Sequence, residues 1–531
     1  MPFIRRACLL FSIRVKRFAG GSEGFNRTLR HAWLEKIPVS GVSPTFSDLG
    51  ALQFAPNAEI FLFSSRREVF RAPTTHERME EHSCVNPHVL DRHSRKTTMT
   101  KTVRPRWYAA IMGLAVLLTA ALTRAEDPPP QEWIRQIRPA DSATQVVADT
   151  FGNIFIAGHT SGNLNGPNAG EADAWFAKYN AFGDQQWIHQ FGTSTSDFVG
   201  GIAVDDVENL YLSGNTSSSL GGPNAGGSDA FLAKFDVNGN PVWTRQIGTT
   251  AYDSAGFFGS VALDGVGGVY LSGSTKGNLG GIQATIEDAF VTKYDESGNR
   301  LWLRQMAPND SDASDAVSSD RNGSIYISGV TFSSLDGQNA GSSDAFVAKY
   351  DVEGILLWTR QLGSSSAEWG RSVSVDGDGN VYVTGETYGS LGAPNGGSKD
   401  AYLAKYDEAG NHHWTRQLPM STSDNSSSVV TDRLGNVFIG GHTGFGADAR
   451  GFVARYNDAG SLRWIMQPDT AATVGSISLD GLGNLYVAGS DRGGGAFLAK
   501  FNGATVPEPS ALTLIALAAI AVSSRFRRKH R

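Results

Sequence analysis

Residues 372–418, SVSVDGDGNVYVTGETYGSLGAPNGGSKDAYLAKYDEAGNHHWTRQL, hold most of one unit that recurs along the chain. The segment 372–376 alternates between polar and apolar residues, as a half-buried strand does. Three more strand-like segments follow at 381–385, 400–406 and 414–418. The Asp-Gly-Asp-Gly-Asn and Asp-Glu-Ala-Gly-Asn segments indicate tight turns, because Asp accepts backbone N–H groups and Gly adopts positive φ. The unit is therefore predicted to be a four-stranded antiparallel sheet.

Three motifs recur seven times in one order. The W-x-x-Q motif has spacings of 54, 56, 59, 56, 56 and 50 residues and begins at Trp133, Trp187, Trp243, Trp302, Trp358, Trp414 and Trp464. A second motif ends in Gly, as in Val-Tyr-Val-Thr-Gly385, and a third follows the pattern D-A-F-x-A-K-Y, with Lys or Arg and then an aromatic residue at its end in every copy. No segment of 10–15 residues with a helical pattern lies between the predicted strands. This excludes a parallel α/β sheet, whose strands are joined by helices. Seven such units predict an all-β fold, a seven-bladed β-propeller of four-stranded antiparallel blades.

The chain ends predict how the ring closes. The last set of strands, 474–501, has no W-x-x-Q strand after it, and the first such strand, 133–137, has no set before it. Residues 133–137 are therefore expected to pair antiparallel with 496–501, so that the N-terminal strand completes the last blade. Closure removes an exposed sheet edge that would otherwise invite aggregation.

Loop length separates the two faces of the predicted ring. The short D-x-x-G-N turns fall on one face, and the long loops, such as 219–229 and 309–315, fall on the other. Long loops on a rigid scaffold are where binding residues usually lie. Any ligand site is therefore expected on the long-loop face.

The segment before the repeats resembles an export signal. Basic residues at 101–106 precede an apolar run at 109–121, and Thr123-Arg124-Ala125 offers a cleavage site after Ala125. We interpret 99–125 as a signal peptide and 126–132 as a linker to a propeller spanning 133–502. Residues 1–98 show no sustained periodicity, and two interpretations stay open for them: a misassigned start before Met99, or a disordered leader.

The C-terminal residues resemble a second targeting signal. Pro507, Glu508 and Pro509 precede an apolar run at 511–522 and a basic end at 525–531. The segment 503–531 resembles a PEP-CTERM sorting signal with a short transmembrane helix. The resemblance implies a protein exported by a Gram-negative bacterium to its surface or matrix. It further implies transient membrane anchoring by the C-terminal helix, with signal peptidase and an exosortase-type enzyme as processing partners.

The repeats resemble a second known family. The segments Asp376-Gly-Asp-Gly-Asn-Val-Tyr-Val-Thr-Gly385 and Asp229-Ala-Phe-Leu-Ala-Lys-Phe235 are similar to those of bacterial SBBP repeat proteins. That resemblance implies a seven-bladed propeller and no particular reaction. Units six and seven depart from the pattern, because Arg450 and Gly495 replace the Asp of D-A-F and the long loop shortens.

The charge of the central body argues against nucleic acid as a partner. Outside residues 1–125 and 507–531, the chain has 22 Lys and Arg against 42 Asp and Glu. A nucleic-acid binder needs a basic stripe to neutralise phosphates. The body has the opposite sign, and its Ser-, Thr- and Asn-rich loops suit glycan or protein partners.

Six residues stand out as ligand-binding candidates. Trp175 and Trp369 lie outside the W-x-x-Q motif and could stack on a ligand, whereas the motif Trp residues are expected in the core. Glu368 adjoins Trp369 on the expected long-loop face. Asp310, Asp312 and Asp315 cluster in one loop; we predict no metal site there, and weak Ca²⁺ binding stays open as the alternative.

The remaining polar motifs have structural interpretations. The Asp of D-A-F is expected to bond the Gln or Arg of W-x-R-Q, and Asp376 is expected to serve its turn rather than a calcium site. No nucleophile or metal-protease motif occurs, so no catalytic residue and no cofactor is predicted. We therefore expect a non-enzymatic binding or scaffold module for glycan or protein partners. The alternative is a polysaccharide-active hydrolase or lyase on a propeller scaffold, and a purely structural coat protein stays open as a third class.

Overall fold

The computed structural model describes residues 126–138, 140–280, 286–306, 310–320 and 322–503. The predictions for 1–98, the signal peptide 99–125 and the sorting tail from residue 504 onward fall outside these residues. Within the described ranges, no helix has the length and apolar character needed to cross a bilayer.

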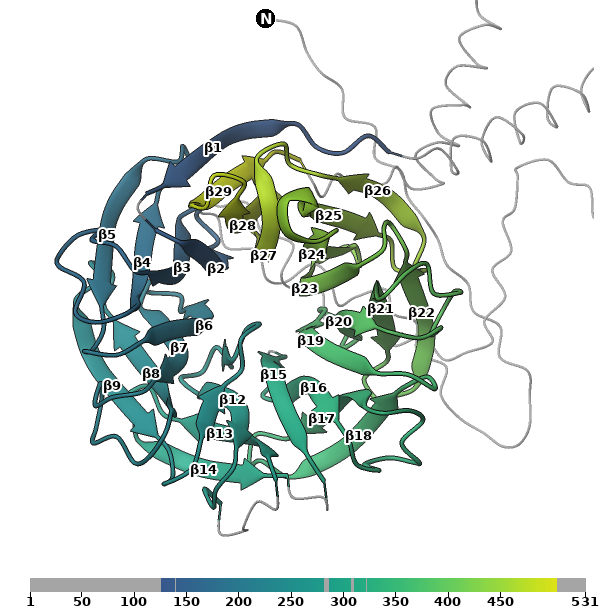
Figure 1. Ribbon diagram of the computed structural model, residues 1–531, viewed down its shortest axis with the longest axis horizontal. Helices are drawn as coiled ribbons and strands as arrows, with labels where there is room; N and C mark the ends of the chain where they lie inside the picture. Colours follow the sequence, from purple (N-terminus) through teal and green to yellow (C-terminus); the bar gives the residue numbers. More distant parts are fainter. Residues whose placement is uncertain (1–125, 139, 281–285, 307–309, 321, 504–531) are drawn as a thin grey trace, which may run out of the picture. The chain divides into compact units, whose positions relative to one another are not determined.

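The described residues form seven antiparallel sheets arranged as a ring (Figure 1), so the predicted seven-bladed propeller is confirmed. The innermost strands are β2 (Ser142–Ala148), β6 (Asp197–Val204), β10 (Asp253–Ala255) with β11 (Val261–Leu263), β15 (Asp312–Ser319), β19 (Glu368–Val375), β23 (Asp424–Thr431) and β27 (Ala471–Leu479). The second strands are β3 (Ile154–Thr160), β7 (Leu210–Thr216), β12 (Val269–Thr275), β16 (Ile325–Thr331), β20 (Val381–Thr387), β24 (Val437–Thr443) and β28 (Leu485–Asp491).

The two outer layers follow in the same order. The third strands are β4 (Asp173–Tyr179), β8 (Asp229–Phe235), β13 (Asp288–Tyr294), β17 (Asp344–Tyr350), β21 (Asp400–Tyr406), β25 (Arg450–Tyr456) and β29 (Ala496–Phe501). The outermost strands are β5 (Gln185–Phe191), β9 (Pro241–Ile247), β14 (Arg300–Gln305), β18 (Leu356–Leu362), β22 (His412–Leu418), β26 (Leu462–Met466) and β1 (Gln131–Ile137). A single 3-10 turn, η2 (Gly446–Asp448), interrupts the described loops. We number the blades one to seven from β2 to β27.

The ring closes as the sequence predicts. Strand β1 pairs antiparallel with β29, from Gln131 opposite Phe501 to Ile137 opposite Ala496, and Figure 1 shows β1 outside β29. The strand begins two residues before the predicted position, inside the segment interpreted as a linker. Glu126 is also held, because its carboxylate pairs with Arg455 of blade six.

The core lies between neighbouring blades. The D-A-F-x-A-K-Y strands are buried on both faces, as in β8 and β21, because other strands flank them and other blades cover them. Phe155 and Phe176 of blade one pack with Leu212 and Phe231 of blade two in one apolar cluster. The burial of apolar area between blades, at roughly 25 cal/mol per Å², is the main force that holds the ring together.

The W-x-R-Q strands also tie each blade to the next. Trp414 Nε1 donates to Asp458 O at 3.1 Å, and Arg416 Nε donates to Gly460 O at 2.8 Å in the neighbouring blade. Across the closure, Trp133 Nε1 donates to Ala181 O at 3.3 Å, so the last blade binds the first in the same way. Five of the seven motif Trp residues are only partly buried, because they lie at this outer junction rather than in the innermost core.

The tight turns lie at one end of the ring, which we call the turn face, and the opposite end is the long-loop face. In the turn after β19, Asp376 Oδ1 accepts the N–H groups of Asp378 at 3.0 Å and Asn380 at 2.9 Å. Asp376 Oδ2 accepts Asn380 Nδ2 at 2.9 Å and the Tyr382 hydroxyl at 3.1 Å. Gly379 takes φ of +83°, a conformation that favours glycine. Asp376 is therefore a turn residue, as expected.

Candidate functional site

The innermost strands carry bulges that aim single side chains away from the regular pleat. In blades four and five the bulged residues are Asp315 and Arg371, which interrupt the pairing register of β15 with β16 and of β19 with β20. A β-bulge locally bends a strand and re-aims a side chain. The equivalent bulged residues in blades one, two and six are small: Thr144, Gly200 and Ser427. The innermost strands of the blades line a small central channel, and blades four and five therefore differ from these blades at the channel wall.

The bulged residues of blades four and five meet in a charged network. Arg371 donates from Nη1 to Asp315 Oδ2 at 2.9 Å and from Nη2 to Glu386 Oε1 at 2.8 Å. Lys399 Nζ donates to Glu386 Oε2 at 2.8 Å. The four side chains are between 3% and 16% exposed. Two cations and two carboxylates balance in this cluster, as buried charges require.

Two aromatic rings pack on the same guanidinium. Arg371 Cζ lies 4.1 Å from the centroid of the Trp369 ring and 5.0 Å from that of Phe258. Trp369 stays partly exposed, and its backbone carbonyl accepts the Tyr402 hydroxyl at 3.2 Å. These contacts hold the indole in place on the long-loop half of β19. We call Asp315, Trp369, Arg371, Glu386 and Lys399 the bulge cluster.

Phe258 belongs to an insertion in blade three. Residues 256–260 separate β10 from β11 and protrude into the middle of the ring between β6 and β15 (Figure 1). Gly259 N donates to Gly200 O at 3.0 Å, and Phe258 N donates to Asp315 O at 3.2 Å. A Cβ at Gly256 would lie 2.3 Å from Asp315 O, so only glycine fits there. The insertion therefore joins blades two, three and four beside the bulge cluster.

Burial and charge move the pKa values of the cluster's two acids in opposite directions. Burial raises the pKa of Asp315 although Arg371 opposes it. Burial also acts to raise the pKa of Glu386, but Arg371 and Lys399 together hold it below its ordinary value. Burial lowers the pKa of His442 in the next blade, and the Lys399 charge adds to that effect. Charged groups of three blades thus influence one another at this end of the channel.

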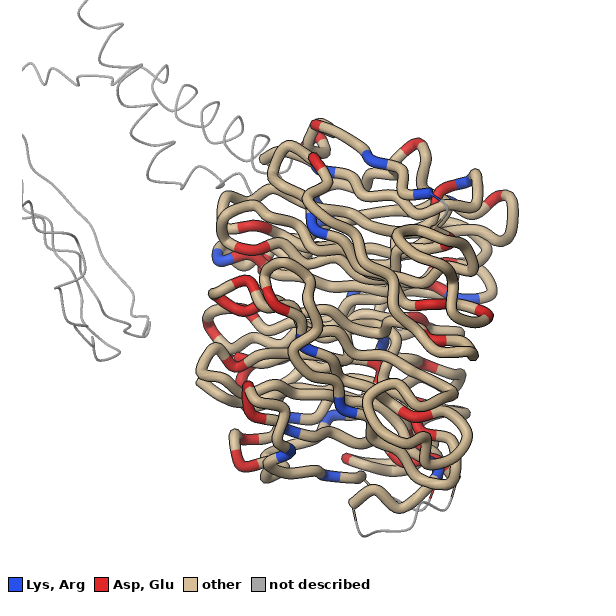
Figure 2. Tube along the Cα trace, turned by 90° about the vertical axis from the view of Figure 1, so that its left-hand side faces the viewer, with Lys and Arg blue, Asp and Glu red and all other residues tan. Residues whose placement is uncertain are grey.

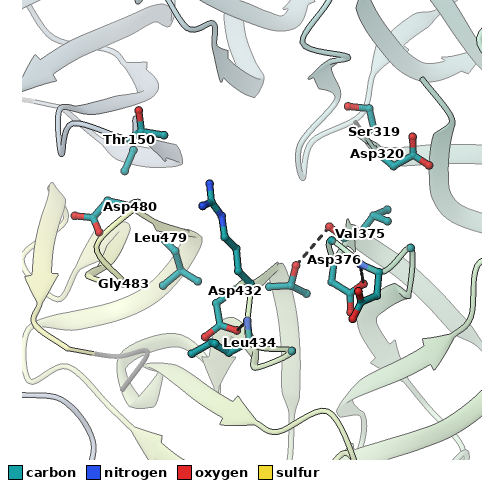
Figure 3. A pocket seen from close by; sticks show the side chains of 18 of the residues that line it. Thr150, Ser319, Asp320, Val375, Asp376, Asp432, Leu434, Leu479, Asp480 and Gly483 are labelled. Atoms are coloured by element: carbon teal, nitrogen blue, oxygen red, sulfur yellow. Dashed lines mark hydrogen bonds between the residues drawn. The ribbon is translucent and has the colours of Figure 1, made fainter. Parts of the chain in front are cut away.

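A separate cavity of about 960 Å³ opens at the turn face. The turns after the innermost strands form its rim, where Thr150, Asp320, Asp376, Asp432 and Asp480 surround the opening (Figure 3). The rim is acidic, but its carboxylates accept backbone N–H groups within their own turns, as at Asp432 and Asp480. The long-loop prediction did not anticipate this turn-face cavity.

The repeated carboxylates of the third strands have structural partners. Gln417 Nε2 donates to Asp400 Oδ2 at 2.8 Å, and its Oε1 accepts Leu391 N at 2.9 Å. The same pair joins Gln and Asp in four other blades: Gln190 with Asp173, Gln246 with Asp229, Gln305 with Asp288 and Gln361 with Asp344. The expected bond to Gln is confirmed, and it holds each long loop against its own blade.

The structure brings Trp369 and Asp315 together but separates the other candidates. Trp175 is fully buried in the core, where its Nε1 donates to His159 O at 3.2 Å, so its ring is not a surface for stacking. Glu368 is fully buried and accepts Ser364 Oγ, which makes it a loop-fixing residue.

The three Asp residues of the blade-four loop, where weak Ca²⁺ binding stayed open, do not gather into one group in the structure. Asp310 is exposed, Asp312 is fully buried, and Asp315 pairs with Arg371. No group of three or more metal-binding side chains gathers anywhere in the described part of the chain. The three carboxylates therefore have separate environments rather than one shared ion.

Charge on the outside of the ring is mixed. On the side shown in Figure 2, acidic and basic residues are interspersed and no basic stripe is visible. Sequence reasoning missed Arg371, Glu386, Lys399 and Phe258. The 59-residue spacing between Trp243 and Trp302 was the available signal for the insertion.

Fold and sequence together define a β-propeller that carries an export-sorting motif. Residues 132–165, 186–221 and 357–392 match the family model described as beta-propeller repeat, SBBP. Residues 505–529 match the PEP-CTERM protein-sorting motif. The chain thus carries SBBP repeats and a PEP-CTERM motif.

More distant likenesses cover only parts of larger proteins. An uncharacterized WD repeat-containing protein of Acanthamoeba polyphaga mimivirus is 20% identical over 60% of this chain and 29% of its own length. The regulatory protein FlaEY of Caulobacter vibrioides is 25% identical over 41% of this chain and 24% of its own. The chain therefore spans less than a third of these relatives. A solved ulvan lyase, a polysaccharide lyase, aligns over 70% of this chain and 95% of its own with a TM-score of 0.40 and 12% identity.

Proposed function

We propose that this protein is an exported, non-enzymatic binding module that holds a glycan or protein partner on its long-loop face at the bulge cluster. The observation that carries the proposal is the position of the cluster. It lies at the channel wall, where blades four and five depart from the repeat, and it presents a partly exposed Trp369 held by Arg371. A fixed aromatic ring offers contact area at little entropic cost.

The use of the carboxylates favours binding over catalysis. Glycoside hydrolysis uses two carboxyl groups that flank the substrate. In five blades the third-strand Asp binds a Gln, and in the bulge cluster both acids bind Arg371. These carboxylates accept hydrogen bonds from Gln and Arg side chains of the protein itself. They fix the structure around them, as a rigid recognition surface requires.

A polysaccharide-active enzyme is the second candidate, and one observation favours it. Environments that push the pKa values of two nearby acids apart are typical of general acid and base pairs. Asp315 and Glu386 show such opposite shifts beside Lys399 and His442. The same shifts also follow from an ion-pair network, which is the interpretation we adopt.

The sorting motif supports the proposed location of the protein outside the cytoplasm. A PEP-CTERM segment is a signal for export with membrane anchoring before processing. We infer that signal peptidase and an exosortase-type enzyme process the chain, and that the propeller acts at the surface or in the extracellular matrix of a Gram-negative bacterium.

A glycan array with the full-length protein at two calcium concentrations tests the proposal. Ligands retained should be recovered chemically unchanged, and calcium should have little effect because the described residues gather no ligand set for it. Shortened or unsaturated saccharides in the eluate would establish the enzyme instead. Arrayed surface proteins provide the second arm for a protein partner.

A further inference from the structure

Both ends of the described chain leave the propeller at the turn face. Asn502 N donates to Pro130 O at 3.2 Å, and Gln131 pairs with Phe501. Strand β29 runs toward the turn face and β1 runs away from it, because the turn that joins β27 to β28 fixes the direction of the whole blade. Whatever follows Gly503 therefore starts at this face.

The same face presents apolar side chains that the fold does not use. The third residue of the turn after the innermost strand is large and apolar in five blades, with exposed fractions of 56–85%: Phe151, Val207, Val266, Leu434 and Leu482. Blades six, seven, one, two and three, which carry these residues, follow one another around the ring. Phe182, in the outer turn of blade one, adds a sixth, 73% exposed.

These residues are not needed to form their turns. Blades four and five have Asn322 and Asp378 at the same position, and their turns keep the same hydrogen bonds to the leading Asp. A polar residue therefore serves the turn equally well. Exposed apolar side chains gathered on one face of a protein indicate a contact surface.

We propose that the turn face rests on a lipid bilayer, with the apolar turn tips of blades six, seven, one, two and three at the interface. Seven residues lie between Gly503 and Ala511, where the apolar run of the sorting segment begins. The eight residue-to-residue steps from Gly503 to Ala511 span at most about 28 Å. A chain anchored through that run is thus held with its turn face toward the bilayer and its apolar tips within reach.

Charge selects the kind of bilayer. Each inner turn begins with an Asp, and Glu408 adds to the acidic lining of the turn-face cavity, where Arg433 is the one cation among the described lining residues. An acidic face is repelled by anionic headgroups. The surface that fits is a zwitterionic bilayer such as phosphatidylcholine.

Quenching by lipid-attached quenchers tests this orientation in the full chain. Cys8 and Cys84 are first replaced by Ser, and one reporter cysteine with an environment-sensitive dye is placed at position 482 or 151. The controls carry the dye at Asp378, the matched turn position, or at Ala225 on the long-loop face. In phosphatidylcholine vesicles we expect strong quenching at 482 and 151, weaker quenching at 378 and none at 225. Equal quenching at all four positions, or quenching at 225 alone, would overturn the proposal.

A second variant separates the tips from the anchor. The triple change Phe151→Ser, Leu434→Ser and Leu482→Ser should leave the melting temperature unchanged and reduce quenching of a dye at position 266 several-fold. Exchange of part of the phosphatidylcholine for phosphatidylglycerol should reduce it as well. Unchanged quenching in the triple variant would show that the tips make no lipid contact. Neither result affects partner binding on the long-loop face, so this inference and the proposed function fail independently.

Discussion

Arg371 and Asp315 occupy equivalent bulges in neighbouring blades, and their side chains meet at 2.9 Å across the wall of the channel. The repeat that builds the ring does not contain this pair. It results from one residue substituted in each of two blades, at the position where a bulge turns the side chain out of the regular pattern. Four neighbouring side chains complete the environment: Trp369, Glu386, Lys399 and Phe258, the last of which comes from an insertion two blades away from Arg371.

The Gln–Asp pair of each blade should contribute measurably to stability. Gln417→Ala removes the donor to Asp400 and the acceptor for Leu391 N, leaving a buried carboxylate short of a partner. We expect a loss of about 1–3 kcal/mol in the free energy of unfolding, with faster amide exchange in residues 391–396. Gln467→Ala is the matched control, because Gln467 is exposed and its blade has Arg450 in place of the Asp. Equal losses in both variants would contradict this role.

Ring closure should behave like any other blade junction. Trp133 Nε1 bonds Ala181 O at 3.3 Å, and Trp358 Nε1 bonds Glu408 O at 3.1 Å in the same geometry. Either Trp→Ala change should cost about 3 kcal/mol in urea unfolding. Deletion of 131–138 should open the ring, abolish single-transition unfolding and promote aggregation through the exposed β29 edge. A deletion variant that still unfolds in one transition at the original midpoint would refute closure by β1.

The fold could be predicted from the sequence because the same strand and turn signals recur in seven units. Alternation in the strands, Asp and Gly in the turns, and the unpaired first W-x-x-Q strand each correspond to a local physical requirement. The arrangement of the strands in blades, and of the blades in a ring, can therefore be predicted without knowing any contact between residues. The order of the strands and the pairing of 133–137 with 496–501 are confirmed on that basis.

The site was less accessible to the same reasoning. Arg371 lies in a bulge, where alternation no longer indicates which face a residue occupies. Glu386 occupies a position that varies from unit to unit, and Phe258 lies in the three-residue excess of the longest unit. Trp175 is an error of the opposite kind: it was predicted to bind a ligand because it lies outside the repeat motif, but its side chain is fully buried in the core. Residues that depart from a repeat are informative only once their neighbours across blades are known.

The pH dependence of stability should report on Asp312. Burial raises the pKa of its carboxyl to about 7, with Thr331 opposing the shift. The unfolded value is about 4, so the protonated form favours the fold. Its contribution is complete below about pH 4 and is lost as the pH rises through about 7.

Asp312→Asn, which is neutral at every pH, should therefore flatten the fall in melting temperature between about pH 4 and about pH 7. Asp310→Asn is the comparison, because that neighbour is exposed and its charge is the smallest of the named causes that raise the Asp312 pKa, so the slope should become only slightly shallower. A steep fall that persists in Asp312→Asn would assign the titration to another group.

The mature chain left after processing should begin close to the first described residue, Glu126. The predicted cleavage after Ala125 would place Glu126 at the new N-terminus, where its carboxylate pairs with Arg455. Mass spectrometry of the native protein should find a mature chain beginning near Glu126 and lacking the basic end 525–531. Abundant peptides from residues 1–98 would contradict both the misassigned start and the signal peptide.

The most direct test of the proposed function is the affinity of the strongest array ligand for Trp369→Ala and Trp358→Ala, measured by calorimetric titration against the unchanged protein. Trp369 lies in the bulge cluster and Trp358 in the outer junction between blades. We predict that Trp369→Ala weakens binding at least about tenfold, which corresponds to about 1.4 kcal/mol, with little change in melting temperature. Trp358→Ala should lower the melting temperature and leave the dissociation constant unchanged. Full affinity in Trp369→Ala would place the partner elsewhere and contradict the account.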